Sequence, residues 1–186
     1  ADLFGKEELV FHVSGGTTDL LHCKGPDSIT CIGTSSDLYA GQAVDRLGVR
    51  LGYAFPAGIY VSQLAAACTE NIKPKVSVRG TTSLSGLQNQ CEKLLAEGKS
   101  PEYVSKYCLL CVAETLRRMA AAALERNPGL PVVFAGGVMS SEIVRDYITK
   151  RMQYAYFVPG KFASDNAIGV SILAAREINA WPNTSM

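Results

Sequence analysis

Two short apolar segments, each ending in a pair of glycines, constrain the fold of this chain most strongly. Residues 8–13 are apolar and β-branched and run into Ser14-Gly15-Gly16, and residues 130–135 run into Gly136-Gly137 in the same way. Apolar runs of this length between turn signals are typical of buried strands, and paired glycines favour tight turns. Backbone amides in such turns can approach a phosphate closely. We therefore expect a sheet in which neighbouring strands end at an anion-binding edge.

The order of the remaining segments indicates an α/β protein with a mixed sheet. Residues 8–13, 18–23 and 28–33 are separated only by glycine-containing turns, which predicts a meander of three strands. Later strands alternate with helices, which predicts parallel pairing with helices packed on the sheet. We expect the order β-β-β-α-β-α-β-α with extra helices inserted. The later predicted elements are strands at 130–135 and 153–158, and helices that start at Ser35 or Ser36, at Pro56, at Ser85, after the Ser100-Pro101 cap, at residue 140 and at Asp165.

Composition excludes several classes of protein. Hydrophobic residues make up 47% of the chain and charged residues 19%, which is incompatible with a mostly disordered protein. The 18 basic and 17 acidic side chains leave a net charge of +1, so charge alone cannot hold a nucleic acid. No apolar run approaches the length of about 18 residues that spans a membrane, so we expect no membrane partner.

The cysteines and histidines have ordinary structural interpretations. The six cysteines are spread through apolar segments, which favours reduced core thiols and a cytoplasmic protein. Cys108 and Cys111 fall within a predicted helix, and we interpret them as buried thiols rather than zinc ligands. His12 and His22 lie on the two arms of the first hairpin and could approach each other, but we expect sheet histidines rather than a metal pair. Ser85 is interpreted as a helix cap rather than a nucleophile.

Six sequence blocks in a fixed order resemble the TsaD family of tRNA threonylcarbamoyladenosine-forming proteins. This family belongs to the actin-like ATPase superfamily and was once described as O-sialoglycoprotein endopeptidases. The first of the six blocks corresponds to the family's Ser-Gly-Gly-His-Thr-Gln loop, and Thr17 stands at the position of the loop histidine. The blocks cover about residues 9–175 and are Ser14-Gly15-Gly16-Thr17-Thr18-Asp19, the stretch from Gly33 to Arg46, Phe55-Pro56-Ala57-Gly58, Ser83-Leu84-Ser85-Gly86-Leu87, Ala135-Gly136-Gly137-Val138 with Val144-Arg145, and Ser164-Asp165-Asn166.

The resemblance implies that residues 1–186 are the single C-terminal lobe of a two-lobe protein, with the fold of an actin-like (ribonuclease H-like) ATPase lobe. It implies an adenine nucleotide (ATP, ADP or an acyl-adenylate) as cofactor. It implies a divalent metal, iron or zinc, only together with the missing N-terminal lobe, which carries the family's two metal-binding histidines. No residue of this chain is given a catalytic role. The implied phosphate loop is Ser14, Gly15, Gly16, Thr17 and Thr18, the implied nucleotide contacts are Asp45, Gly58 and Ser141 (Asn in the family), and the implied metal ligand is Asp165.

Two functional classes remain open at this point. In the first, the chain is the nucleotide lobe of an enzyme that transfers a carbamoyl-containing group to adenosine of tRNA, and the isolated lobe is expected to be inactive. In the second, it is a non-catalytic scaffold or regulatory relative that kept the fold and lost the site. Asp45, Gly58 and Asp165 favour the first class. Gln42, Ser62 and Ser141 stand where the family has Glu, Asp and Asn, and they favour the second.

The predicted partners follow from the same resemblance. They are the missing N-terminal lobe and a second copy of the chain, bound through the face of the first strand and the helix after it. An apolar face of more than a few hundred Å² seldom stays bare, which is why we expect such a partner. Binding of tRNA and accessory subunits is expected only for the full-length protein.

Overall fold

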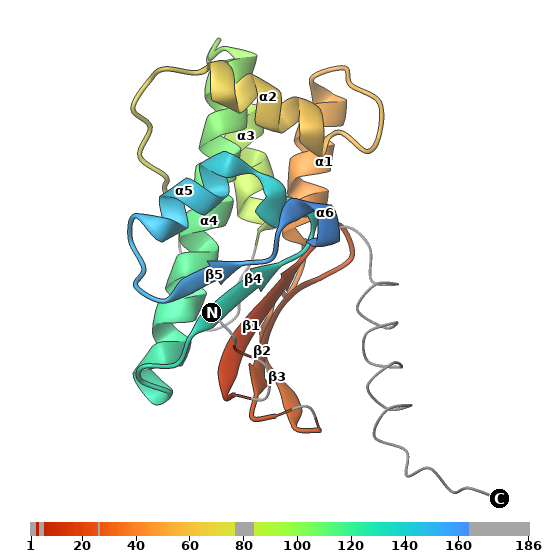
Figure 1. The fold of residues 1–186 in the computed structure, drawn as a ribbon. Helices are drawn as coiled ribbons and strands as arrows, with labels where there is room; N and C mark the ends of the chain where they lie inside the picture. The colour runs from red at the N-terminus through yellow and green to blue at the C-terminus, as the bar shows by residue number, and fades with distance from the viewer. Residues whose placement is uncertain (1–2, 4–5, 26, 77–83, 164–186) are drawn as a thin grey trace, which may run out of the picture.

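The computed structural model describes residue 3 and residues 6–25, 27–76 and 84–163, and Figure 1 shows its elements. The helix predicted from Asp165 lies outside the described residues. The strands are β1 (Glu8–Val13), β2 (Thr18–Cys23), β3 (Ile29–Thr34), β4 (Val132–Ala135) and β5 (Ala155–Phe157). The helices are α1 (Ala40–Arg50), α2 (Gly58–Ala67), α3 (Ser85–Ala96), α4 (Pro101–Arg126), the 3-10 turn η1 (Gly137–Ser140), α5 (Glu142–Thr149) and the short α6 (Gly160–Ala163).

The strands form one five-stranded mixed sheet in the order β3-β2-β1-β4-β5. β1 pairs antiparallel with β2, and β2 pairs antiparallel with β3, so the predicted meander is confirmed. β4 lies parallel to both β1 and β5, as the alternation of strands and helices predicted. The register places His12 beside Ala135, so the carboxyl ends of β1 and β4 meet at one edge of the sheet. The predicted α/β fold is therefore confirmed.

One face of the sheet carries the core. Leu9, Phe11 and Val13 of β1 point to this face and are fully buried, as are Val132 and Phe134 of β4. The rings of Phe11 and Phe134 stack with their centroids 5.0 Å apart. These side chains form one buried cluster with apolar residues of α4, the long helix that runs along the sheet in Figure 1. Alternation with a period of two thus decides which side chains of the strands enter the core.

The exposed large apolar side chains lie partly on the helix that we predicted to face a partner. Val49 of α1 is 51% exposed, whereas none of the residues of β1 is among the exposed large apolar side chains. Ile29 and Ile32 of the edge strand β3 are 58% and 43% exposed, and Phe55, Ile59 and Tyr60 near the connection between α1 and α2 are also exposed. Within the described ranges, no helix combines the length and the apolar character needed to cross a membrane.

The two neighbouring cysteines of α4 are buried free thiols, as predicted. A hydrogen bond with Cys91 of α3, together with burial, raises the pKa of Cys108 well above its ordinary value. Burial raises the pKa of Cys111 to about 11. Both thiols are therefore protonated at neutral pH, which suits their place in the core between α3 and α4.

Helix α4 begins where the sequence predicts. The Oγ of Ser100 accepts a hydrogen bond from the amide of Tyr103 at 3.2 Å, and Pro101 occupies the first helical position. We expect Ser100→Ala to lower the free energy of unfolding by about 1 kcal/mol, because this amide loses its partner. Urea unfolding measures the change. Ser100→Asp keeps an acceptor oxygen and should match the parent; an equal loss in both variants would show that the cap is not the cause.

Helix α1 begins later than predicted, because its cap comes from another part of the chain. Ser35 and Ser36 were the expected caps, but the Ser35 hydroxyl donates to the carbonyl of Leu38 at 2.6 Å and stabilises a turn instead. The first helical residue is Ala40, whose amide donates to Thr18 Oγ1 at 2.8 Å. The prediction of the cap is wrong because the hydroxyl that binds the helix start belongs to β2.

Three further helices differ from the prediction in their first residue or in their cap. Ser85 is the first residue of α3 rather than its cap, and the carboxylate of Asp37 accepts hydrogen bonds from the amides of Leu84 and Ser85. α2 starts at Gly58, two residues after Pro56. The helix predicted over residues 140–151 is the shorter α5, which starts at Glu142, and the residues before Ser141 form the separate 3-10 turn η1.

Candidate functional site

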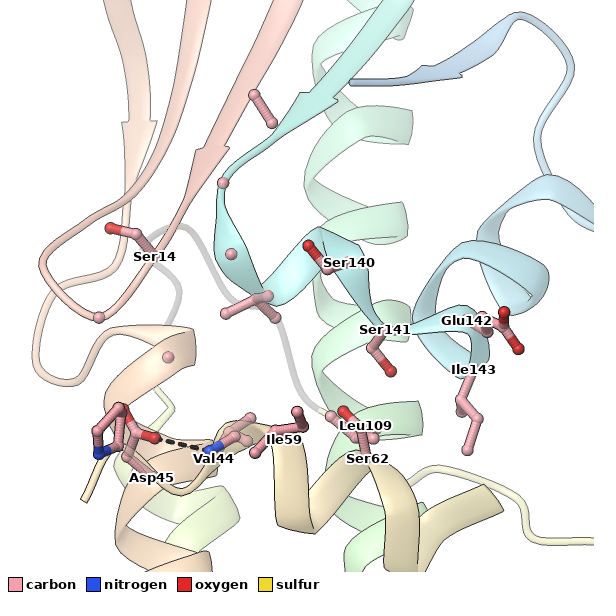
Figure 2. A pocket seen from close by; sticks show the side chains of 18 of the residues that line it. Ser14, Val44, Asp45, Ile59, Ser62, Leu109, Ser140, Ser141, Glu142 and Ile143 are labelled. Atoms are coloured by element: carbon pink, nitrogen blue, oxygen red, sulfur yellow. Dashed lines mark hydrogen bonds between the residues drawn. The ribbon is translucent and has the colours of Figure 1, made fainter. Parts of the chain in front are cut away.

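A cavity of about 1210 Å³ lies where the carboxyl ends of β1 and β4 meet the helices. Ser14 and Gly15 follow β1, Gly136 and Gly137 follow β4, and all four line the cavity. The other walls come from α1, α2, α4 and the start of α5, as Figure 2 shows. The two Gly-Gly turns picked out in the sequence therefore open into the same space.

The loop after β1 is held by its own hydrogen bonds. The amide of Ser14 donates to the carbonyl of Thr17 at 2.9 Å, and Ser14 Oγ accepts from the amides of Gly16 and Thr17 at 3.1 and 3.2 Å. Thr18 is fully buried and connects the loop to α1 through the amide of Ala40. Of the predicted phosphate loop, only Ser14 and Gly15 line the cavity, while Gly16, Thr17 and Thr18 shape the turn behind them.

Two glycines allow the backbone to come close at this edge. Gly136 has φ +104°, and a Cβ there would overlap the backbone of Val13. Gly41 of α1 donates its amide to the carbonyl of Ser14 at 3.1 Å, and a Cβ on it would lie 2.5 Å from the amide nitrogen of Gly15. The turn after β4 thus packs directly on the end of β1, and the loop after β1 packs directly on the start of α1, without an intervening side chain.

Asp45 and Gly58, predicted as nucleotide contacts, lie together in the cavity wall. Asp45 Oδ1 accepts hydrogen bonds from the amides of Ala57 and Gly58 at 2.8 and 3.0 Å. A dashed line at Asp45 in Figure 2 marks hydrogen bonding at this point. Both bonds use one oxygen, so within the described part of the chain Oδ2 is the oxygen left for a ligand. The carboxylate therefore joins α1 to the start of α2 and also presents an acceptor to the cavity.

The other end of the cavity is lined by apolar and hydroxyl side chains. Leu109 of α4 and Ile143 of α5 line it together with Ser62 of α2 and Ser141, as Figure 2 shows. Ser141 is 8% exposed, and its Oγ has no hydrogen-bond partner among the described residues. Ser141, which the resemblance implies as a nucleotide contact, thus lines the cavity together with Ser62, which stands where the family has Asp.

His12 is a site residue that the sequence interpretation missed. Both histidines are sheet residues, as expected, and they do not approach each other, because His12 is paired with Asp19 and His22 with Leu9 at the other end of the hairpin. His22 Nε2 lies 2.8 Å from Glu7. His12 is exposed, lines the cavity, and has Nδ1 2.8 Å from Thr17 Oγ1. The sequence did contain a signal for this role: His12 is two positions before a loop in which Thr17 replaces the family's histidine.

The implied metal site cannot be built from the described residues. Asp165 is the single ligand that the resemblance assigns to this chain, and it lies outside them. Among the residues the structure describes, no three His, Cys, Asp or Glu side chains are grouped closely enough to hold a metal ion. We therefore derive no chemical step through a metal.

The sheet, its strand-end turns and the cavity define the class of this protein, which has the fold of an actin-like ATPase lobe. A sequence model described as tRNA N6-adenosine threonylcarbamoyltransferase matches residues 1–171. The chain therefore belongs to the TsaD family, as the six sequence blocks predicted.

Two curated relatives show how much of the family's length the chain covers. The tRNA N6-adenosine threonylcarbamoyltransferase of Francisella tularensis subsp. holarctica is 27% identical over 191 residues, which are 94% of this chain and 56% of that protein. The protein of the same name from Streptococcus equi subsp. zooepidemicus is 30% identical over 179 residues, 89% of this chain and 52% of that one. The chain thus spans about half the length of these relatives.

Solved structures of low sequence identity share the fold. Full-length HypF in its phosphate- and nucleotide-bound form matches with a TM-score of 0.68 at 12% identity, over 83% of this chain and 37% of that one. The activator of the 2-hydroxyisocaproyl-CoA dehydratase from Clostridium difficile, with bound ADPNP, matches with a TM-score of 0.60 at 9% identity, over 96% of this chain and 65% of that one.

Proposed function

We propose that this chain is the nucleotide-binding lobe of a tRNA threonylcarbamoyl transferase. The observation that carries the proposal is that one cavity joins the turns after β1 and β4 to Asp45 and Gly58. Phosphate oxygens would bind at the glycine turns, where backbone amides are the donors. Ribose hydroxyls would donate to Asp45 Oδ2. The base would lie at the end of the cavity between α2 and α5, where Leu109 and Ile143 offer apolar surface.

The transfer reaction is proposed for the whole protein rather than for this lobe. Relatives of about twice this length are named for the transfer of a threonylcarbamoyl group to N6 of adenosine in tRNA. A lobe that holds an acyl-adenylate in one orientation would contribute by positioning its reactive carbonyl group against the tRNA base. The second lobe, tRNA and accessory subunits are proposed as partners on this basis. A metal held by Asp165 and the second lobe would supply a Lewis acid when bound.

Asp45 variants test the nucleotide proposal. Asp45→Asn keeps an oxygen for the amides of Ala57 and Gly58 but loses the second carboxylate oxygen, so we expect ADP affinity about tenfold weaker at unchanged stability. Asp45→Ala also loses both amide partners, so it should bind more weakly still and be less stable by about 1–2 kcal/mol. The measurement is an ADP titration followed by the amide NMR signals of Gly15 and Gly58, with urea unfolding for stability.

The control for charge alone is Asp146→Asn, because Asp146 is exposed on α5. It should bind ADP as the parent does. We expect the parent itself to bind weakly, in the millimolar range, because the second lobe of a closed cleft is missing. If millimolar ADP moves neither glycine signal in the parent, the nucleotide proposal is wrong. If Asp45→Asn binds as well as the parent, Asp45 is not a ribose contact.

A further inference from the structure

We infer that His12 is the phosphate-facing side chain of this cavity and replaces the loop histidine that the family carries at position 17. The inference rests on the proposed nucleotide site and adds to it a residue outside the six family blocks. His12 is the fifth residue of β1, two positions before Ser14. It lines the cavity together with Ser14 and Gly15, so its imidazole and the glycine turn face the same space.

The hairpin places the imidazole against position 17. The loop turns back after Gly16, and Thr17 Oγ1 comes within 2.8 Å of His12 Nδ1. Thr17 Oγ1 is also 3.1 Å from Ser14 Oγ. Thr17, which stands where the family has histidine, is therefore in contact with a histidine of the preceding strand. In this chain the imidazole at the loop comes from position 12 instead of position 17.

The hydrogen bonds around Thr17 indicate which ring nitrogen is free to donate. Ser14 Oγ already accepts hydrogen bonds from two amides. Its own hydroxyl proton can be donated to Thr17 Oγ1, which is 3.1 Å away. The single proton of the Thr17 hydroxyl can go to His12 Nδ1 at 2.8 Å or to the carbonyl oxygen of His12 at 3.4 Å. When it goes to Nδ1, the shorter of the two contacts, the neutral imidazole carries its proton on Nε2. A neutral His12 is therefore already a donor for a phosphoryl oxygen, and a protonated one adds a charge.

The charges around the cavity make this donor important. None of the described residues that line it is Lys or Arg, and the charged side chains among them are Asp45 and Glu142. Asp19, the cross-strand partner of His12, adds a carboxylate whose Oδ1 accepts from Thr34 Oγ1 at 2.6 Å. An anionic ligand thus meets acidic side chains, backbone amides and one imidazole. His12 is the lining side chain that can offset the acidic surroundings of a phosphate.

The experiment uses the fact that the chain has only two histidines. ADP and inorganic triphosphate are titrated into the protein while the imidazole NMR signals are recorded. We expect the His12 signal to shift with both ligands and the His22 signal to stay in place. His12→Phe should bind ADP about tenfold more weakly, as expected for the loss of one hydrogen bond to a charged group. His22→Gln is the matched control and should bind as the parent does.

An exchange variant separates a ligand contact from a structural role. His12→Thr combined with Thr17→His returns the imidazole to the family's position and should restore most of the ADP affinity that His12→Thr alone loses. If ADP shifts the Gly58 amide but His12→Phe binds as tightly as the parent, the inference is wrong while the nucleotide proposal stands. If ADP shifts no signal in the parent, both are wrong.

Discussion

Glu114→Gln is expected to lower the free energy of unfolding by about 2–3 kcal/mol, the largest loss of stability that we predict for a single polar residue. The Glu114 side chain is buried in α4, and its carboxylate accepts from Arg117 at 2.6 and 2.9 Å, from Arg118 at 2.7 Å and from the Tyr147 hydroxyl at 3.1 Å. Arg118 also donates to the carbonyl of Val76. Removing one partner of a buried ion pair costs about 3–5 kcal/mol, and the partial exposure of both arginines reduces this.

The pH dependence of stability gives a second measure of the same interaction. Hydrogen bonds from Arg117, with Arg118 and Tyr147, lower the pKa of Glu114 from its ordinary 4.5 to about 2. A lowered carboxyl pKa adds stability above the unfolded pKa, and this stability is lost as the pH falls through the folded value. The difference between the parent and Glu114→Gln should therefore be largest above about pH 5 and shrink toward pH 2.

Urea unfolding of both proteins at several pH values tests this expectation. The control is Glu92→Gln, since Glu92 pairs with Arg50 at 3.0 Å but both side chains are well exposed. Exposed pairs contribute about 0–1 kcal/mol, so Glu92→Gln should stay close to the parent at every pH. A loss at Glu114 no larger than that at Glu92, or one that does not depend on pH, would contradict the ionic role of Glu114.

The helix starts show which parts of the fold local sequence can predict. Ser100-Pro101 was interpreted correctly because cap and helix are neighbours in the chain, and the capping bond spans three residues. The caps of α1 and α3 were misassigned because they are Thr18 and Asp37, which are 22 and 47 residues away from the amides they bind. Such a cap forms only after segments that are distant in the sequence have packed, so no local pattern contains it. The strands, set by local alternation and turns, were found correctly.

In the candidate site, too, local sequence predicted some features, while others depend on contacts between distant segments. The resemblance assigned Asp45 and Gly58 to one nucleotide pocket, and the structure joins them through a hydrogen bond of 3.0 Å and one cavity wall. His12 was interpreted as a sheet histidine because a strand position says nothing about which loop returns to it. The register of the hairpin, with Val13 opposite Thr18, brings Thr17 back to His12. A substitution inside a motif is therefore best interpreted together with the residues that the turn places beside it.

Gly41→Ala is expected to weaken ADP binding by at least tenfold and to lower the free energy of unfolding by about 1–3 kcal/mol, the usual cost of overpacking. Gly41 lies in the first turn of α1. A Cβ there would be 2.5 Å from the nitrogen of Gly15 and 2.6 Å from the carbonyl carbon and oxygen of Ser14. These are backbone atoms, and they cannot relieve the overlap by rotating to another rotamer, as the end of a side chain can. The loop after β1 must therefore move away from α1, and the amides that face the cavity move with it.

Gly16→Ala is the matched control, because it lies in the same loop and an added Cβ would meet no atom within 4 Å. It should bind ADP and unfold as the parent does. The measurements are the ADP titration followed at the Gly15 and Gly58 amides, and urea unfolding of the three proteins. If Gly41→Ala loses stability but keeps its ADP affinity, the loop after β1 is not a phosphate site. If both alanine variants lose affinity equally, the loop binds through flexibility rather than through its fixed contact with α1. A selective loss in Gly41→Ala would show that close packing of the helix start on the loop holds the anion-binding backbone in place.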